Sequence, residues 1–344
     1  MSARAPIPAR PAPPAPRAAW SWRNPATRAL VWQALAVAAV LGLVAWLAHN
    51  TQANMAARGI RSGWDFLTQP AGFDIGEQPI AFDAADAYWK AFGVGLLNTL
   101  RVAVAAIVLC TVVGAAVGVG RFSPNGPVRA LCRAYVEAFR NVPLLVQLLV
   151  WYLLLMETLP EPAQAWRWGE AVFVSKAGLS LPFPAPGEAG WHWSVPAPGA
   201  FAIEGGATLT SEFLAVLAGL SFYTAAFVAE VVRAGIAAVP RGQVEAAQSI
   251  GLTRWQVLRR VTGPQALRVM VPPLTNQYLN LTKNSSLAVA VGYPELVSIA
   301  NTSLNQTGRA LECIAIVMAV YLALSLATAL AMGLVNRRAA LRER

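Results

Sequence analysis

The chain has 344 residues, of which 56% are hydrophobic and only 13% are charged, and its formal net charge is +10. Because a soluble domain usually carries roughly 25% charged residues, this composition excludes an ordinary water-soluble protein. The arginines stand in short segments beside long apolar runs, so the positive charge indicates membrane topology rather than binding to nucleic acid.

The first segment, 1–28, is rich in Pro, Ala and Arg, has no apolar period, and predicts a disordered tail. The apolar run 29–48 is long enough to cross a bilayer core of about 30 Å and ends without a clear cleavage site, which predicts an uncleaved anchor helix. A core of further spans is expected over 92–335. The six predicted spans are 29–48, 92–119, 135–156, 209–232, 269–292 and 313–335.

The distribution of arginine predicts the orientation. If the N-terminus lies inside, 18 of the 27 basic residues fall in inner segments, and both outer segments are net acidic, which predicts that both termini lie in the cytoplasm. The outer segment 157–208 is rich in Pro, Gly and Trp and is either an interfacial cap or a docking surface for an external partner. The inner segments are 1–28, 121–133, 233–268 and 336–344, and the outer segments are 49–91 and 157–208.

The inner loop 233–268 is polar and basic between two apolar spans. A short helix is predicted over 243–250, with Glu245 in its first turn, where a carboxylate complements the helix dipole. Gly251 then permits a bend, and a second short helix follows, which Pro264 is expected to end. Physical arguments alone leave open an amphipathic hairpin that arginines hold at a lipid surface.

The spacing in this loop has a known counterpart. Glu245-Ala246-Ala247, three residues, Gly251, nine residues, and then Val261-x-x-Pro264 closely resembles the cytoplasmic EAA signature of importer-type ABC permeases. That family usually has Ile at the position of Val261 and Leu at that of Gly263. Three further segments resemble polar amino-acid permeases, and the first outer loop resembles that of the larger permease subunit of general L-amino-acid uptake systems. These segments are 137–147, 223–236 and 280–287, and 72–76 in the outer loop.

The resemblance implies an all-α membrane protein of the bacterial inner membrane, a type I ABC importer transmembrane subunit with five core helices plus one extra N-terminal helix. It implies that two permease subunits form the pore, and a different, related partner is favoured over a second copy. Two cytoplasmic ATPase subunits would bind the loops, and a periplasmic binding protein would deliver amino acids. Carried onto this chain, the ATPase contacts are Glu245, Ala246, Ala247 and Gly251.

The same resemblance assigns ATP and Mg to the partner ATPase and no cofactor to this chain. The sequence itself contains no Gly-x4-Gly-Lys-Ser/Thr phosphate loop, so it predicts a transport subunit that is not an enzyme. No spacing of residues indicates a catalytic or metal site. A membrane-embedded enzyme would instead show a cluster of acid, base, nucleophile or metal ligands.

The fifth predicted span is the most polar and contains Pro272-Pro273, which interrupt helical hydrogen bonding and favour a cavity wall over a lipid-facing helix. Amides and hydroxyls supply donors for a carboxylate and acceptors for an ammonium group. The candidate substrate-pathway residues are Thr224, Gln277, Asn280 and Asn284. They also fit plain inter-helix hydrogen bonds. An ion-coupled secondary amino-acid transporter is the alternative function, and it predicts paired broken helices in two repeated halves.

Overall fold

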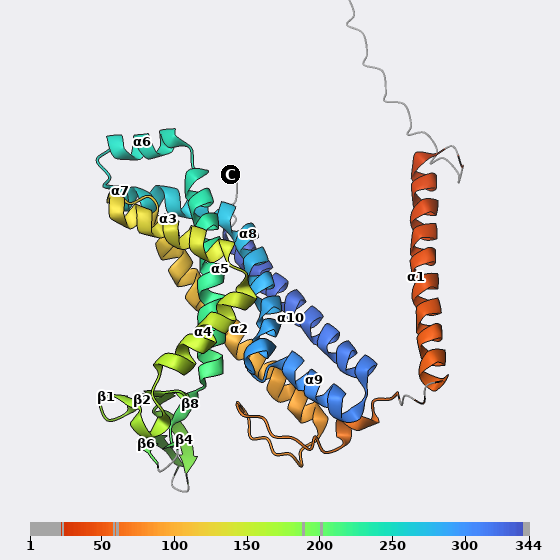
Figure 1. Cartoon of the computed structure of the whole chain (residues 1–344). Helices are drawn as coiled ribbons and strands as arrows, with labels where there is room; N and C mark the ends of the chain where they lie inside the picture. The colour runs from red at the N-terminus through yellow and green to blue at the C-terminus, as the bar shows by residue number, and fades with distance from the viewer. Residues whose placement is uncertain are drawn as a thin grey trace, which may run out of the picture. The chain divides into compact units, whose positions relative to one another are not determined.

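The computed structural model describes residues 22, 24–57, 59, 62–187, 190–199 and 202–339, and it divides into two units, residues 1–62 and 63–344, each described by itself (Figure 1). The first unit contains α1 (Pro25–Ala57), which is longer at both ends than the predicted anchor, and none of its side chains is buried. Over residues 29–48 its side chains are apolar except for Gln33, as a lipid-facing span requires. Residues 1–21 and 23 of the predicted tail lie outside the described residues.

Two long helices, α2 (Tyr88–Gly120) and α5 (Ser211–Ala237), pack against each other in the second unit. A Cβ placed on Gly114 of α2 would lie 2.6 Å from Val228 of α5, and Gly118 repeats this approach one turn later. Because glycine has no side chain, the two backbones approach closely, as small residues allow in membrane helix pairs.

The predicted third span, 135–156, is wrong as a single helix. The structure has two helices here, α3 (Gly126–Asn141) and α4 (Leu144–Thr158), and their axes meet at 106°. The apolar α4 has 15 residues, so it is only about 22 Å long. The broken pair therefore crosses a bilayer core only if both helices contribute.

The break has a local cause. Pro143 lacks a backbone N–H and forces the preceding Val142 into an extended conformation, with φ −100° and ψ 128°. The side-chain amide of Gln147 then donates to the carbonyls of Phe139 and Val142, at 2.9 Å each. These bonds satisfy carbonyls at the end of α3 that the break would otherwise leave unpaired.

The segment predicted as the outer loop 157–208 contains short antiparallel strands, so the expectation of an all-α chain is corrected to a mostly helical one. Its main sheet has the strand order β1-β2-β3-β8. Two separate two-stranded sheets, β4-β5 and β6-β7, are formed by the residues between β3 and β8. The extended conformation suits the β-branched and aromatic residues of this segment better than a helix does. The elements are η2 (Pro162–Gln164), β1 (Trp166–Trp168), β2 (Val172–Ser175), β3 (Gly178–Leu181), β4 (Phe183–Gly187), β5 (Gly190–Ser194), β6 (Ala197–Pro198), β7 (Ile203–Glu204) and β8 (Ala207–Leu209).

The remaining helices follow α5 or precede α2. The predicted fifth span, 269–292, begins earlier than expected and changes to a 3-10 helix before it ends. The elements are η1 (Asp65–Thr68), α6 (Arg241–Ser249), α7 (Arg254–Val257), the π-helical η3 (Leu258–Thr262), α8 (Gly263–Asn284), η4 (Ser285–Val291), α9 (Leu296–Thr307) and α10 (Ala310–Ala339).

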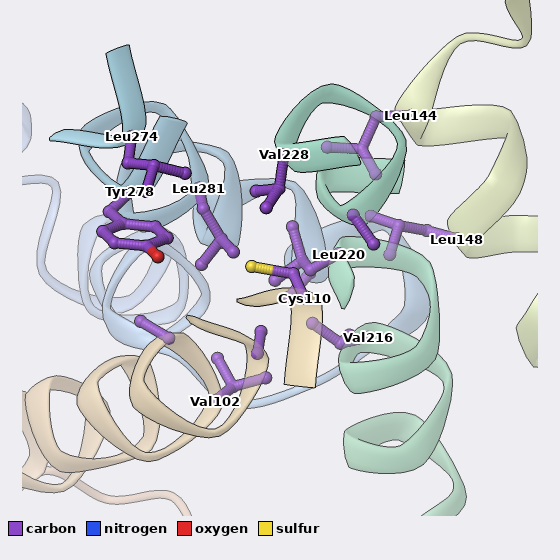
Figure 2. Close-up of a cluster of buried hydrophobic side chains, with 14 of the residues drawn as sticks. Val102, Cys110, Leu144, Leu148, Val216, Leu220, Val228, Leu274, Tyr278 and Leu281 are labelled. Carbon is purple, nitrogen blue, oxygen red and sulfur yellow. The ribbon is translucent and has the colours of Figure 1, made fainter. Parts of the chain in front are cut away.

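The main hydrophobic core lies where α2, α4, α5 and α8 meet (Figure 2). Cys110, Leu148, Leu220 and Leu281, one from each of these helices, are all fully buried there. Burying a leucine side chain contributes about 1.5–3 kcal/mol in an aqueous reference state. These contacts set the position of α8 against its neighbours.

Among the described residues, four helices are long and apolar enough to cross a membrane, namely α1, α2, α5 and α10, and the α3–α4 pair makes five if it counts as one span. Helix α8 has sufficient length but a more polar composition. The structure therefore supports a multi-pass membrane protein, and the count of six spans stays a prediction.

Candidate functional site

The first candidate surface is α6 and the turn after it. Glu245 and Ala246 are exposed, whereas Ala247 is buried and attaches the helix to the rest of the protein. The backbone of Gly251 has φ +86°, and its N–H donates to the carbonyl of Gln248 at 2.9 Å. A left-handed residue that closes a helix in this way is usually glycine. The four predicted contact residues thus lie on one short helix and its C-terminal turn.

The second short helix, α7, begins with a capping box. The Thr253 hydroxyl accepts from the backbone N–H of Gln256, and the Gln256 side chain accepts from the backbone N–H of Thr253 at 2.9 Å. Trp255 is 67% exposed on this helix, and Ile250 is 78% exposed in the preceding turn. Large apolar side chains that are this exposed beside polar helix ends are typical of a surface that a partner covers.

The prediction that Pro264 ends the second short helix is wrong. The chain continues from α7 through the π-helical η3 into α8 without a break. The N–H of Gly263 donates to the carbonyl of Leu258, five residues earlier, so the hydrogen-bond ladder is already offset where Pro264 lacks its N–H. As a result α7 and α8 form one continuous helical segment.

A side-chain contact also joins α6 to α8. The Gln265 amide group donates to the side-chain oxygen of Gln243 in α6 and, at 3.1 Å, to the carbonyl of Val261. The short helix that carries Glu245 is therefore connected to α8 in two ways, through this contact and through the continuous backbone.

The second candidate surface is a polar face of α8. Asn276, Asn280 and Lys283 follow one another at intervals of four and three residues, and all three are exposed. Residues at this spacing lie on the same side of an α-helix. The opposite side is apolar and belongs to the core, with Leu274, Tyr278 and Leu281 buried (Figure 2).

The four predicted pathway residues lie in different surroundings. Asn280 is on the polar face, Asn284 is partly exposed at the end of α8, and Gln277 lines a cavity of about 280 Å³ between α5 and α8. Thr224 is 4% exposed in α5. The structure thus places Gln277, Asn280 and Asn284 on or beside the exposed side of α8. Thr224 is instead buried where α5 packs against its neighbours.

The cavity beside Gln277 has charged walls. Glu230 of α5 pairs with Arg121 at the end of α2 and accepts from Arg233 at 2.8 Å, while the Arg140 guanidinium lies 5.1 Å from the centre of the Phe227 ring. These contacts agree with the structural pairing that charged residues within spans usually show. The ion pair connects α2 to α5 near the start of the segment 233–268, which was predicted as an inner loop.

Glu77, in the segment 49–91 that was predicted as the first outer loop, is buried, and no sequence pattern had indicated it as a site residue. Its carboxylate pairs with Arg101 of α2 and accepts from the Thr210 hydroxyl at 2.6 Å, and its backbone carbonyl accepts from Asn98 at 2.9 Å. Burial raises the pKa of Glu77, while the bonds from Thr210 and Arg101 oppose that rise. The available signal was Arg101, because an arginine inside an apolar helix requires a counter-charge.

Glu77 also borders a cavity of about 460 Å³. The segment 73–77, most of the motif noted in the predicted first outer loop, forms one wall of this cavity, and Thr210, Glu212, Pro294 and Ser298 contribute to the others. The cavity lies at the opposite end of α2 and α5 from α6, because Tyr88 and Ser211 begin those helices here.

Comparison with known proteins agrees with this geometry. The family described as binding-protein-dependent transport system inner membrane component matches residues 98–341. The chain is 43% identical to YhdX of Escherichia coli (strain K12), over 94% of this chain and 97% of that one. It is 38% identical to the general L-amino acid transport system permease protein AapQ of Rhizobium johnstonii, over 94% of this chain and 96% of AapQ.

A solved structure described as an amino acid ABC transporter with histidines aligns with a TM-score of 0.54 and 27% identity, over 73% of this chain and 95% of that chain. The fold of the second unit is therefore that of a membrane subunit in this class of transporter. From these matches, this chain belongs to the family of binding-protein-dependent transport system inner membrane components.

Proposed function

We propose that this chain is a pore-forming permease subunit of an ATP-driven amino-acid importer. The observation that carries the proposal is the connection of the exposed α6 to the polar face of α8, through the contact of Gln243 with Gln265 and through a short turn into the continuous helical segment of α7, η3 and α8. It joins a surface that a partner protein can bind to a helix whose polar face can line the pathway of a polar substrate. The amino-acid substrate is supported by the description of AapQ and of the aligned structure.

The ATPase subunits would bind the exposed side of α6, with Glu245, Ala246 and Gly251 at the contact, while the buried Ala247 holds the helix against the rest of this chain. ATP and Mg belong to those subunits, and closure of the ATPase pair would move α6. Because α6 is joined to α8 through Gln243 and Gln265, and through the short turn that leads into α7, its motion would rotate α8 and shift the polar face between the two sides of the membrane. This is alternating access driven by a partner.

The proposal includes α8 as the sixth span. Its 22 residues correspond to about 33 Å, enough to cross a bilayer core. Its low hydropathy follows from the polar face, which a pathway-lining helix needs and a lipid-facing helix excludes. With six spans in the bacterial inner membrane, both termini lie in the cytoplasm, and the strands of 166–209 lie outside.

The other partners follow from this assignment. A second, related permease subunit would face α8 and complete the pore, and a periplasmic binding protein would deliver the amino acid at the outer end. A heterodimer is favoured, since the chain resembles the larger of two permease subunits in general L-amino-acid systems. An ion-coupled transporter would need no exposed α6 surface, so the ATP-driven mechanism is the better explanation of that surface.

The test is the Glu245→Lys variant in the whole transporter, reconstituted in proteoliposomes with ATP inside and binding protein outside. We expect that the ATPase subunit no longer co-purifies and that uptake of the amino acids is lost. The matched control for ATPase co-purification is Glu204→Lys, the same change at an exposed carboxylate of β7, outside α6. If the wild-type chain takes up no amino acid from a broad panel, or if it never co-purifies with an ATPase, the proposed function is wrong.

A further inference from the structure

Lys283 differs from the other lysines of this chain. The sequence contains three, and Lys90 and Lys176 each pair with a carboxylate, Asp86 at 2.6 Å and Glu161 at 2.8 Å. Lys283 has no ion pair with any described residue, and its side chain is exposed on the polar face of α8. Its ammonium group is thus available to a group outside this chain.

The position of Lys283 along the helices places it at membrane depth. Five residues before it, the Tyr278 hydroxyl bonds that of Thr111 in α2 at 2.7 Å. After it, the backbone N–H of Leu296 donates to the hydroxyl of Thr99 in α2 at 3.2 Å. Lys283 therefore lies at the level of α2 between Thr99 and Thr111, in the interior of an apolar span.

An ammonium group at this depth cannot face lipid without a large cost. Such groups face a water-filled pathway or a counter-charge, and they mark the routes of substrates and ions. Asn276 and Asn280 lie on the same face, so the surroundings of Lys283 on this side are polar. The unsatisfied charge is positive, so its ligand is an anionic group.

We propose that Lys283 binds the α-carboxylate of the amino acid during transport, with the Asn280 amide beside it. The inference rests on the proposed function, because it takes the substrate to be an amino acid. Every amino acid carries this carboxylate, so one ammonium group serves a broad set of substrates and leaves the choice of side chain to other contacts. A charge-assisted bond of this kind is among the stronger polar contacts in proteins.

The test compares Lys283→Met and Lys283→Arg with wild type in the reconstituted whole transporter. Loss of the charge should raise the KM for transport of L-glutamate and L-arginine about tenfold or more, and Lys283→Arg should retain most of the wild-type affinity. The control is Lys90→Met, the same change at a lysine whose ion pair lies in the first turn of α2. It should leave transport unchanged.

A second measurement isolates the carboxylate. Binding of L-glutamate and L-arginine to the assembled complex in nanodiscs, without binding protein, is compared with binding of their decarboxylated amines, γ-aminobutyrate and agmatine. Wild type should prefer the amino acids over the amines, and Lys283→Met should lose that preference. Equal preference in both proteins, with normal wild-type uptake, would overturn the role of Lys283 and leave the proposed function intact.

The same variants also test whether Lys283 pairs with the second permease subunit instead of the substrate. If Lys283→Met fails to assemble with the second permease, and Lys283→Arg restores assembly without affecting the preference for a carboxylate, then the lysine pairs with a carboxylate of the partner subunit and the inference is wrong. Absence of uptake by the wild-type transporter would instead contradict the proposed function itself.

Discussion

The backbone N–H of Gly263 donates to the carbonyl of Leu258, and a Cβ on Gly263 would lie only 2.6 Å from that oxygen. This relationship makes a π-turn at the junction of α7 and α8, a place where the related permeases usually have leucine. The turn takes the chain past Pro264 without a break. It is the structural reason why a motion of α6 and α7 would be transmitted to α8.

Gly263→Ala should therefore lower the stability of the folded protein and weaken the coupling of ATP hydrolysis to transport. The added Cβ is expected to displace the Leu258 carbonyl and to lower the free energy of unfolding by about 1–3 kcal/mol. Thermal unfolding of the complex in nanodiscs measures the first effect, and uptake per ATP hydrolysed measures the second. Gly333→Ala in α10 is the matched control, because a Cβ there meets nothing within 4 Å and the residue lies outside α6. Equal behaviour of the two variants would contradict the prediction.

The contact between Gln243 and Gln265 should contribute to the coupling of ATP hydrolysis to transport without contributing to the binding of the ATPase subunit. We expect Gln243→Ala to reduce uptake per ATP hydrolysed, while the ATPase subunit still co-purifies because Glu245 and Ala246 are unchanged. Gln265→Ala should have the same effect, and the double variant should be no worse than either single one. Additive losses would show that the two side chains act independently.

The close approach of α2 and α5 predicts that the stability of the folded protein depends strongly on the glycines at their contact. Gly114→Ala should lower the free energy of unfolding by about 1–3 kcal/mol, since the new Cβ would lie 2.6 Å from Val228. Gly93→Ala in the same helix is the control, because no atom lies within 4 Å of the position of its Cβ. Thermal unfolding distinguishes them, and an unchanged midpoint for Gly114→Ala would exclude this packing.

The buried Glu77 predicts a dependence of stability on pH. Its folded pKa is raised above the ordinary value of 4.5, so the folded protein binds its proton more tightly than the unfolded chain. The contribution of Glu77 to the free energy of unfolding therefore decreases as pH rises from about 4.5 through the folded pKa. Relative to wild type, Glu77→Gln should become more stable as pH rises through this window, as thermal unfolding at a series of pH values can measure.

Asp86 supplies a control, because its pKa is shifted in the opposite direction to that of Glu77. Its pKa is lowered from 3.8, first by the hydrogen bond from Lys90, so its stabilising contribution is present above 3.8 and is lost as pH falls through the folded pKa. Asp86→Asn should thus be least stable relative to wild type near neutral pH. A Glu77→Gln profile with the same sign as that of Asp86→Asn would contradict the assignment.

Apolar run length, arginine placement and motif spacing were sufficient to predict the membrane class, the approximate position of most spans and the residues of the α6 surface. Apolar run length and arginine placement depend on the bilayer, whose thickness and charge asymmetry act on any chain in the same way. The spacing from Glu245 to Gly251 is equally local, because a short helix and one left-handed residue define it.

Only the tertiary structure decided how these parts are joined. At the break before Pro143, the Gln147 amide satisfies the carbonyls that the break exposes, and at Gly263 a hydrogen bond to the Leu258 carbonyl makes the π-turn. The face of α8 that stays exposed, with Lys283 unpaired within the described chain, depends on which neighbours cover its other side. The exposed face of α8 is a long-range packing relationship, whereas the two turns arise from hydrogen bonds between residues close in sequence, and an apolar period records neither.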